Sequence, residues 1–308
     1  MILYKYVPPE RVDILTNQEI AFPPPSIFND PFEMVPRFDT TVPTELLEEM
    51  LTDEMERASA AGEIESRVDN QLGPILPLLQ EKYPALNVDE LTNYLRDFSV
   101  RWVKENLPAV SELYSTMGGQ DGLAAFGEQT QQRIDALCGV FSLSGVGSNI
   151  LMWSHYARSH TGLVIAFKSE HPFFDRRRNA DDPIRRIKPV QYHRVRPSHR
   201  GLDFRSADIA VELVDHMLFS KAIDWAYEEE WRMIMATEDA DRFLDAGGKR
   251  LPLFNVPSDA FHSVTIGMRA SKDLEDLVVE TVRKDLSHVD VRRAVLDRDE
   301  YAIVLADL

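Results

Sequence analysis

Residues 138–167 hold two apolar runs that flank a short aromatic segment. The first run, Leu137–Leu143, is rich in the β-branched and aromatic residues that suit a strand. Ser144, Gly145 and Gly147 interrupt it, and Ser148 can then cap a helix that runs to about Arg158. The second run, Leu163–Phe167, has the character of a buried strand. The stretch therefore predicts a strand, a turn, a helix and a second strand.

The short helix carries Trp153, Ser154, His155 and Tyr156 in succession, with His160 just beyond it. Consecutive helical residues point about 100° apart, so one buried face cannot hold all four side chains. At least one polar-tipped ring must face an edge, a cleft or solvent. Two interpretations stay open: the aromatic rings are ordinary packing, or the helix forms one wall of a ligand cleft.

Composition excludes several classes of protein. The 308 residues are 44% hydrophobic and 28% charged, and no apolar run approaches the roughly 20 residues of a membrane span. The N-terminal residues MILYKYVPPE show no signal peptide, and the single cysteine, Cys138, fits a reducing cytoplasm. A net charge of −17 argues against nonspecific binding to nucleic acid or anionic membranes. We expect a cytoplasmic protein without a membrane partner.

The N-terminal region predicts two strands and a turn. Ile2–Val7 alternates as a strand does, a short helix can follow through Leu15, and Glu19–Phe22 is a second strand that ends at three prolines. The sequence Phe28–Glu33 (FNDPFE) then predicts a turn, because Asn and Asp before Pro favour one. This turn is either structural or places Asn29, Asp30 and Glu33 at a cleft.

Residues 44–132 change to a helical character. Their first part is acidic and amphipathic, and Asn87 with Glu90 three residues later makes a helix cap. We expect a helical insertion or subdomain within one α+β domain that spans residues 1–308. Its acidic runs suit solvated faces.

Residues 175–200 are unusually basic, with nine Arg or Lys against three Asp. Within them, Ile187–Tyr192 has the pattern of a strand. The segment either guides a phosphate-bearing ligand or offsets the acidic helices, and we favour the second interpretation. If nucleic acid binds at all, the loop 176–200 is where we expect it.

Two carboxylates and a guanidinium share one face of a late strand. Ser206–Ala222 predicts a helix, and Glu228–Met235 then predicts a strand. On that strand Glu228, Glu230 and Arg232 would lie on one face with Ile234, while the other face is mostly apolar. Charged groups beside a core are costly unless they are paired or used.

The C-terminal region predicts a strand at Val264–Gly267, a helix at Ser271–Asp285, and strands at Val289–Leu296 and Tyr301–Leu305. Phosphate-loop, H-E-x-x-H, paired C-x-x-C and G-x-S-x-G motifs are all absent from the sequence. The pattern as a whole predicts an α+β fold around a mixed, mainly antiparallel sheet.

Three blocks of sequence together resemble a bacterial domain-of-unknown-function family, the one numbered 2971. They are LYKY at 3–6 with FNDPFE at 28–33; FS at 141–142 with LMWSHYA at 151–157 and HTG at 160–162; and YEEEWR at 227–232. The combination is specific and spans about Leu3 to Arg232, but the family implies no established activity. The segment Thr44–Gln132 lies outside the blocks.

The order of the blocks is also similar to the layout of ADP-ribosyltransferases. That likeness implies a split sheet and NAD as co-substrate, with no metal. It assigns catalysis to Glu230, Glu228 and Tyr156, although the His or Arg that these enzymes carry on the first strand is missing. Cofactor binding would fall to the following residues: Tyr4, Tyr6, Asn29, Ser142, Trp153, His155 and Arg232.

Three functions therefore stay open. The leading one is transfer of ADP-ribose from NAD to an unknown acceptor, in a defence (including phage defence) or toxin effector. The alternatives are a metal-dependent phosphodiesterase or nuclease that uses Asp30, Glu33, Glu228 and Glu230 around Mg²⁺, and a noncatalytic binding protein. If one site exists, we expect the following side chains in a single cleft: Tyr6, Asn29, Trp153, Tyr156 and Glu230.

Overall fold

The computed structural model describes residues 1–32, 34–35, 38–39, 131–132, 134–180, 182, 184–197, 199–200, 215–246 and 249–308, together with positions 57, 66, 81, 87, 90, 92 and 93. The chain forms two compact units. The first comprises Met1–Arg37, Glu128–Ser198 and Asp203–Leu308, and the second comprises Phe38–Gly127 and His199–Leu202.

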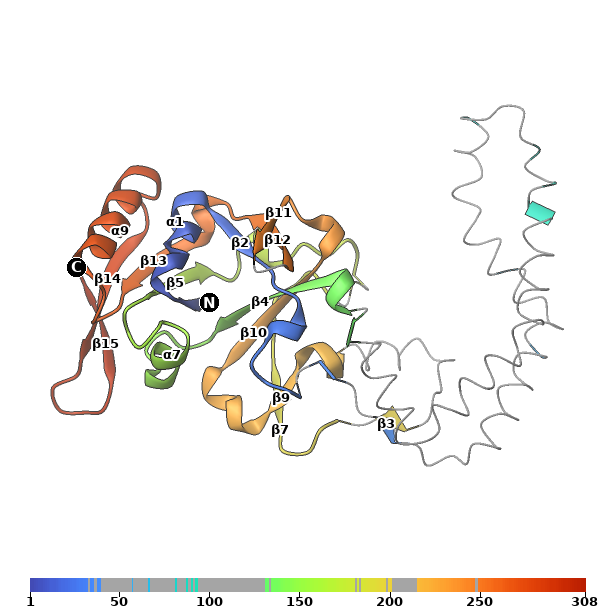
Figure 1. The fold of residues 1–308 in the computed structure, drawn as a ribbon, viewed down its shortest axis with the longest axis horizontal. Coiled ribbons are helices and arrows are strands. Elements are labelled where there is room, and N and C mark those ends of the chain that lie inside the picture. The colour runs from blue at the N-terminus through green and yellow to red at the C-terminus, as the bar shows by residue number, and fades with distance from the viewer. Residues whose placement is uncertain are drawn as a thin grey trace. The chain divides into compact units, whose positions relative to one another are not determined.

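The first unit alternates short strands with helical turns (Figure 1). Its strands are β1 Ile2–Val7, β2 Glu19–Ala21, β4 Cys138–Ser144, β5 Leu163–Lys168, β6 Lys188–Pro189, β7 Gln191–His193, β9 Ser220–Ala222, β10 Glu230–Ala236, β11 Arg242–Ala246, β12 Lys249–Asn255, β13 Phe261–Ile266, β14 Asp290–Leu296 and β15 Ile303–Asp307. Its α-helices include α1 Asp13–Asn17, α7 Ile150–His155 and α9 Lys272–Asp285. Its 3-10 helices are η1 Pro9–Val12, η2 Pro25–Ile27, η3 Pro172–Phe174, η4 Ile223–Glu228, η5 Thr237–Asp239 and η6 Ser258–Ala260.

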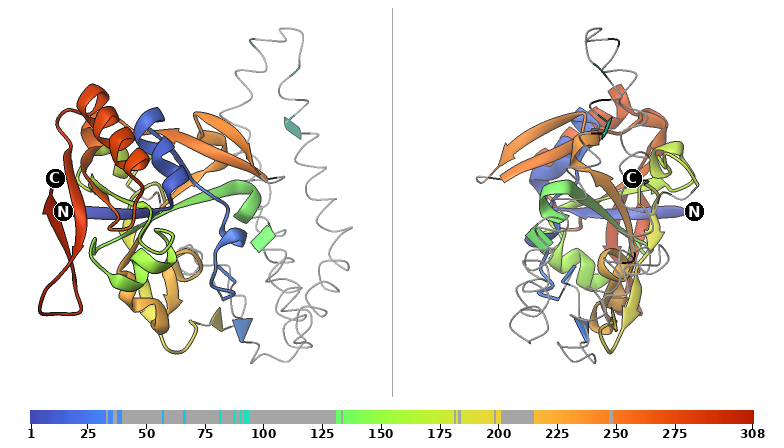
Figure 2. Two further views of the ribbon diagram at one scale, coloured as in Figure 1. Left: turned by 60° about the vertical axis from the view of Figure 1, so that its left-hand side comes forward. Right: turned by 90° about the vertical axis from the view of Figure 1, so that its right-hand side faces the viewer.

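Eight strands form one sheet in the order β15-β14-β13-β5-β1-β4-β10-β6. Its neighbouring strands are antiparallel except β13 and β14, which are parallel and are connected through α9. A smaller sheet of β11, β12 and β2 extends away from it (Figure 2). The predicted α+β fold with a mixed, mainly antiparallel sheet is confirmed.

The two faces of the central strands differ in chemistry. Met233 and Met235 of β10 pack into the largest apolar cluster, together with Phe141 of β4. Ile234 lies in a separate cluster, on the face that also carries Arg232. The predicted division of this strand into an apolar face and a charged face is confirmed from residue 230 onward.

Several predicted boundaries were wrong. Helix α7 is shorter than expected, and Asn149 caps it in place of Ser148, because the Asn149 side chain accepts the N–H groups of residues 151 and 152. The chain then leaves the helix through three consecutive residues with positive φ, Arg158 to His160. The predicted strand Ile187–Tyr192 is divided between β6 and β7.

The predicted helix Ser206–Ala222 was also partly wrong. Residues 215–219 are helical, but Ser220–Ala222 forms strand β9, which pairs with β7. Residues 206–214 lie outside the described part of the chain. The change from helix to strand turns Lys221 inward, where it is buried.

The second unit contains most of the predicted helical insertion. Residues 44–132 lie largely outside the described residues, so the insertion stays a prediction. Two described positions agree with it, because the Asn87 side chain accepts the N–H of Glu90 at 3.1 Å. Strands β3 Phe38–Asp39 and β8 His199–Arg200 pair in parallel within this unit.

Helix α9 is amphipathic and adds one face to the largest apolar cluster. Ser271 caps it by accepting the N–H of Leu274 at 3.2 Å, and Leu274, Val278 and Val282 are buried. The opposite face is exposed. Among the described residues, no helix combines the length and apolarity that crossing a membrane requires.

Adjacent valines on α9 test this packing. Val278 is fully buried and Val279 is 37% exposed. We expect Val278→Ala to lower the free energy of unfolding by about 2–3 kcal/mol, because it removes buried methyl groups and leaves a cavity. Val279→Ala, the matched control, should change it by less than about 0.5 kcal/mol. Urea unfolding of both variants measures the difference, and equal effects would contradict the assigned face.

Candidate functional site

A cleft of about 260 Å³ lies where the three sequence blocks meet. The blocks are far apart in the chain, but β1, β4 and β10 are neighbours in the sheet, so the fold brings them together. The residues that line the cleft are Tyr4, Lys5, Tyr6, Pro23, Ile27, Phe28, Asn29, Val140, Ser142, Leu143, Ser144, Met152, Tyr156, Lys221, Glu228 and Glu230.

The cleft opens where β1 and β4 separate. The two strands pair at Tyr4 and Ser144, whereas β1 pairs with β5 along its whole length. Further along β4, the chain after β2 takes the place of β1, because Val140 donates its N–H to the Pro23 carbonyl at 3.0 Å. Gly139 permits this approach, since a Cβ atom there would lie 2.2 Å from the carbonyl oxygen of Phe22. Divergent neighbouring strands leave room for side chains from both.

The strand on which both carboxylates were expected is interrupted between them. Glu228 ends η4, Glu229 has φ of 44° and ψ of 51°, and β10 begins only at Glu230. The prediction of a continuous strand from 228 was therefore wrong. The left-handed conformation of Glu229 nevertheless leaves both Glu228 and Glu230 facing the cleft. Ser144 stabilises this interruption of the strand by donating its hydroxyl to the Glu228 carbonyl at 2.6 Å.

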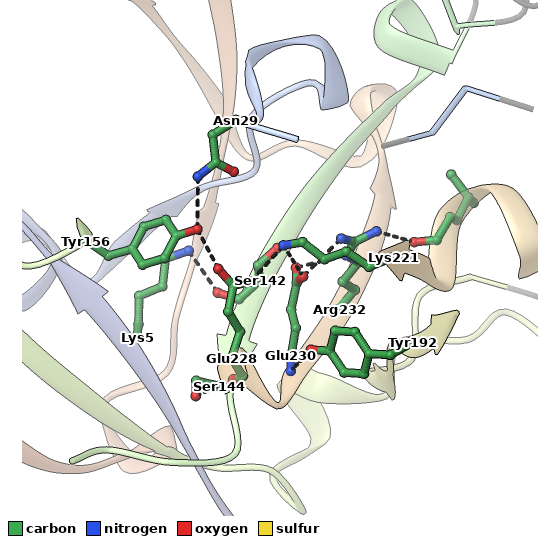
Figure 3. A network of polar contacts seen from close by, with 11 residues as sticks. Lys5, Asn29, Ser142, Ser144, Tyr156, Tyr192, Lys221, Glu228, Glu230 and Arg232 are labelled. Atoms are coloured by element: carbon green, nitrogen blue, oxygen red, sulfur yellow. Dashed lines mark hydrogen bonds and ion pairs between the residues drawn. The ribbon is translucent and has the colours of Figure 1, made fainter. Parts of the chain in front are cut away.

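Lys221 bridges the two carboxylates (Figure 3). Its Nζ lies 2.7 Å from Glu228 Oε2 and 2.9 Å from Glu230 Oε2, and all three side chains are buried. Burial works against the charge on Lys221, but the two carboxylates outweigh it and raise its pKa above the usual value. Lys221 therefore stays an ammonium.

Arg232 completes the pairing of Glu230. Its Nε and Nη2 donate to the two Glu230 oxygens at 2.8 and 3.0 Å, and its Nη1 donates to the Leu218 carbonyl at 2.8 Å. The guanidinium is fully buried behind the cleft wall. Burial raises the pKa of Glu230, and Lys221 opposes that shift. A bidentate pair of this kind fixes the carboxylate in one orientation.

Tyr156 connects the remaining blocks to Glu228. Its hydroxyl donates to Glu228 Oε1 at 2.6 Å and accepts from Asn29 Nδ2 at 3.1 Å (Figure 3). Burial and then the hydrogen bond to Glu228 raise the Tyr156 pKa above its usual value, so the phenol keeps its proton. One chain of hydrogen bonds thus runs from Asn29 through Tyr156 to Glu228.

Most of the residues predicted from the sequence meet in this cleft. Tyr4, Tyr6, Asn29, Ser142, Tyr156, Glu228 and Glu230 all line it. The Tyr6 hydroxyl also closes the turn before α7, because it donates to the Val146 carbonyl at 2.8 Å and accepts from the Asn149 N–H at 3.2 Å.

Three predicted residues do not line the cleft. Trp153 is fully buried beneath it, stacks on His160 and donates Nε1–H to the Gly147 carbonyl at 3.1 Å, so it is a packing residue. His155 is exposed and lies outside the cleft lining. Arg232 acts from behind Glu230. The placement of Trp153 and His155 was wrong because α7 turns only Met152 and Tyr156 toward the cleft.

Two lysines in the cleft were missed from the sequence. Lys5 is a single charged residue within the strand Ile2–Val7, and that isolation was a usable signal. Lys221 was missed because the residues before it have a helical pattern, which placed it at the end of a predicted helix.

The basic segment 175–200 is largely paired with acids. Arg177 lies 2.8 Å from Asp175, while Arg178 and Arg185 reach Asp239 at 2.7 and 2.8 Å. These acids belong to the segment itself and to η5, so the expected offsetting of the acidic helices at residues 44–132, which lie largely outside the described residues, stays a prediction. Nothing in these contacts points to nucleic acid.

A model of the family described as "Protein of unknown function (DUF2971)" matches residues 152–233. The match confirms the family resemblance over a range that includes Tyr156, Lys221, Glu228, Glu230 and Arg232. No match was found among curated proteins or solved structures. The likeness to ADP-ribosyltransferases gains no support from these comparisons.

Removing Arg232 tests the buried charge cluster. We expect Arg232→Ala to lower the free energy of unfolding by about 3–5 kcal/mol, because Glu230 loses its bidentate partner inside the protein. Arg11→Ala is the control: it breaks a partly exposed pair with Asp13 and should cost less than about 1 kcal/mol. Equal unfolding midpoints for the two variants in urea would show that the cluster is not buried in solution.

Proposed function

We propose that this protein, which carries the DUF2971 segment, binds a nucleotide in the cleft and transfers ADP-ribose from NAD to an acceptor. The observation that carries the proposal is a carboxylate, Glu228, held in a fixed position on a wall shared with three tyrosines. Tyrosine rings can hold a flat aromatic group such as nicotinamide. The volume, about 260 Å³, is just below the about 300–1,000 Å³ of whole-ligand sites, so it suits the reactive end of a dinucleotide.

The two carboxylates have different capacities for further contacts. An ionised carboxylate accepts about four hydrogen bonds. Glu230 accepts three from Arg232 and Lys221, and a hydrogen bond from Ser142 also lowers its pKa. From the described residues, Glu228 accepts two, from Tyr156 and Lys221. Glu228 therefore has free acceptor capacity toward the cleft, and Glu230 serves to position Lys221.

The proposed reaction places positive charge near Glu228. The bond between ribose C1′ and the nicotinamide nitrogen breaks, nicotinamide leaves with the electron pair, and C1′ becomes cationic. A nucleophile of the acceptor then forms a bond to C1′ and loses its proton. A preorganised carboxylate stabilises such an oxocarbenium-like transition state, as in glycoside cleavage. Tyr156 and Lys221 supply the preorganisation.

The metal-dependent alternative is less well supported. Glu228 and Glu230 already accept hydrogen bonds from Lys221 and Arg232, and a cation would have to displace these groups. Asp30 is buried but does not line the cleft, and Glu33 lies outside the described residues. Among the described residues, no group of three or more His, Cys, Asp or Glu could hold a metal ion.

Substitution of two consecutive glutamates, Glu228 and Glu229, tests the assignment. We expect Glu228→Gln to reduce nicotinamide release from NAD by about 10²–10³-fold, because the shape is kept and the charge is lost. Glu229→Gln is the matched control and should release nicotinamide at the normal rate, since Glu229 lies outside the cleft lining. Chromatography of the products, with and without EDTA, measures the release.

Each alternative has its own outcome in the same assay. Full activity of Glu228→Gln with an unchanged melting temperature would refute the role of Glu228. Appearance of AMP and nicotinamide mononucleotide in place of nicotinamide, and its abolition by EDTA, would favour the metal-dependent phosphodiesterase. Binding of NAD without any nicotinamide release would favour the noncatalytic binding protein.

A further inference from the structure

Lys5 is the cation of the cleft that has no carboxylate partner among the described residues. Its Nζ donates to the backbone carbonyl of Ser142 at 2.8 Å, across the gap where β1 and β4 have separated. The ammonium also lies 5.1 Å from the centre of the Phe141 ring. An ammonium has three donors, so two of them have no protein acceptor among the described contacts.

The other two cations near the cleft, Lys221 in its lining and Arg232 behind it, are paired with buried carboxylates. Lys221 is held between two carboxylates, and Arg232 donates to Glu230 and to a backbone carbonyl. Neither can turn toward a ligand without leaving a buried carboxylate unpaired. An incoming anion would therefore meet Lys5 as the available positive charge.

We propose that Lys5 is the counter-ion for a phosphate group of the ligand, so that the cleft selects nucleotides over uncharged nucleosides. This inference rests on the proposed function, because it names the substrate group that the cleft recognises. The position of Lys5 suits this role, because its side chain itself lines the cleft that Tyr4 and Tyr6 also line. A phosphate oxygen would take up its two spare donors.

The surroundings of Lys5 disfavour its positive charge. Burial lowers its pKa to about 8, Glu230 and Glu228 partly oppose this, and Arg11 adds to it. An isolated, partly buried ammonium is costly, so a phosphate bound beside it would stabilise the charged form and raise its pKa again. Binding of the anion and protonation of Lys5 are therefore linked.

Equilibrium binding without turnover tests the inference. The probes are ADP, inorganic pyrophosphate and adenosine, titrated into wild type, Lys5→Met, Lys5→Arg and Lys168→Met. We expect Lys5→Met to weaken ADP and pyrophosphate binding by about 10–100-fold, the range for a hydrogen bond to a charged group, and to leave adenosine binding unchanged. Lys168→Met is the control, since Lys168 lies on the adjacent strand β5 but outside the cleft lining.

The pH dependence gives a second readout. In wild type, ADP affinity should be nearly constant from about pH 7 to about pH 8, where the ADP phosphate is ionised, and fall by up to about tenfold per pH unit above it, as free Lys5 loses its proton. In Lys5→Arg the affinity should stay level over this range, because a guanidinium keeps its charge. Lys5→Met should fold at least as stably as wild type at neutral pH, since it removes a desolvated charge.

The outcomes separate this inference from the proposed function. Unchanged ADP affinity in Lys5→Met, or an equal loss of adenosine binding, would overturn the role of Lys5. Selective loss of ADP binding would support it even if wild type releases no nicotinamide from NAD, a result that would end only the proposed transfer reaction.

Discussion

The site depends on one buried ammonium, Lys221, placed between two carboxylates. Without it, Glu228 and Glu230 would be two like charges close together in a region of low dielectric, which is costly. Lys221 pairs with both carboxylates, and Arg232 pairs with Glu230 from behind the cleft wall. The surrounding structure serves this pairing: the left-handed residue at 229 turns both carboxylates to one side, and β9 brings in the lysine.

The separation of β1 from β4 is the second requirement. A continuous ladder between these strands would fill the space with backbone hydrogen bonds and leave no cleft. Here the chain after β2 takes over the pairing with β4, and the long side chain of Lys5 reaches the carbonyl that faces the gap. The outcome is a cavity with an apolar wall, three tyrosines and, among the described residues, one cation without a carboxylate partner. Such a cavity suits a flat ring with an attached anion.

Local patterns predicted much of the fold. The alternation of Ile2–Val7 and the apolar run Leu163–Phe167 correspond to β1 and β5, and the predicted helix Ser271–Asp285 corresponds to α9. Predictions were wrong where a non-local contact decided the conformation. Lys221 was expected on a helix. It lies instead on strand β9, which pairs with β7, and from there it contacts Glu228 and Glu230. The hydrophobic pattern does not predict the interruption of the strand at Glu229. Ser144 at the end of β4 and the adjacent Gly145, both distant in the chain, stabilise it through hydrogen bonds.

The sequence by itself determined the chemistry of the site: two carboxylates, an arginine, a tyrosine and an asparagine in three short blocks. Their residue types and order are visible without coordinates, because charged groups beside apolar runs must be paired or used. Only the tertiary structure decided which of them meet. It turned Tyr156 toward the cleft and Trp153 into the core, since α7 has one narrow face on the cleft. It also filled the hydrogen-bond acceptor sites of Glu230, while Glu228 keeps free acceptor capacity with respect to the described residues. Side-chain direction and hydrogen-bond saturation depend on neighbours distant in the chain, and no local pattern records them.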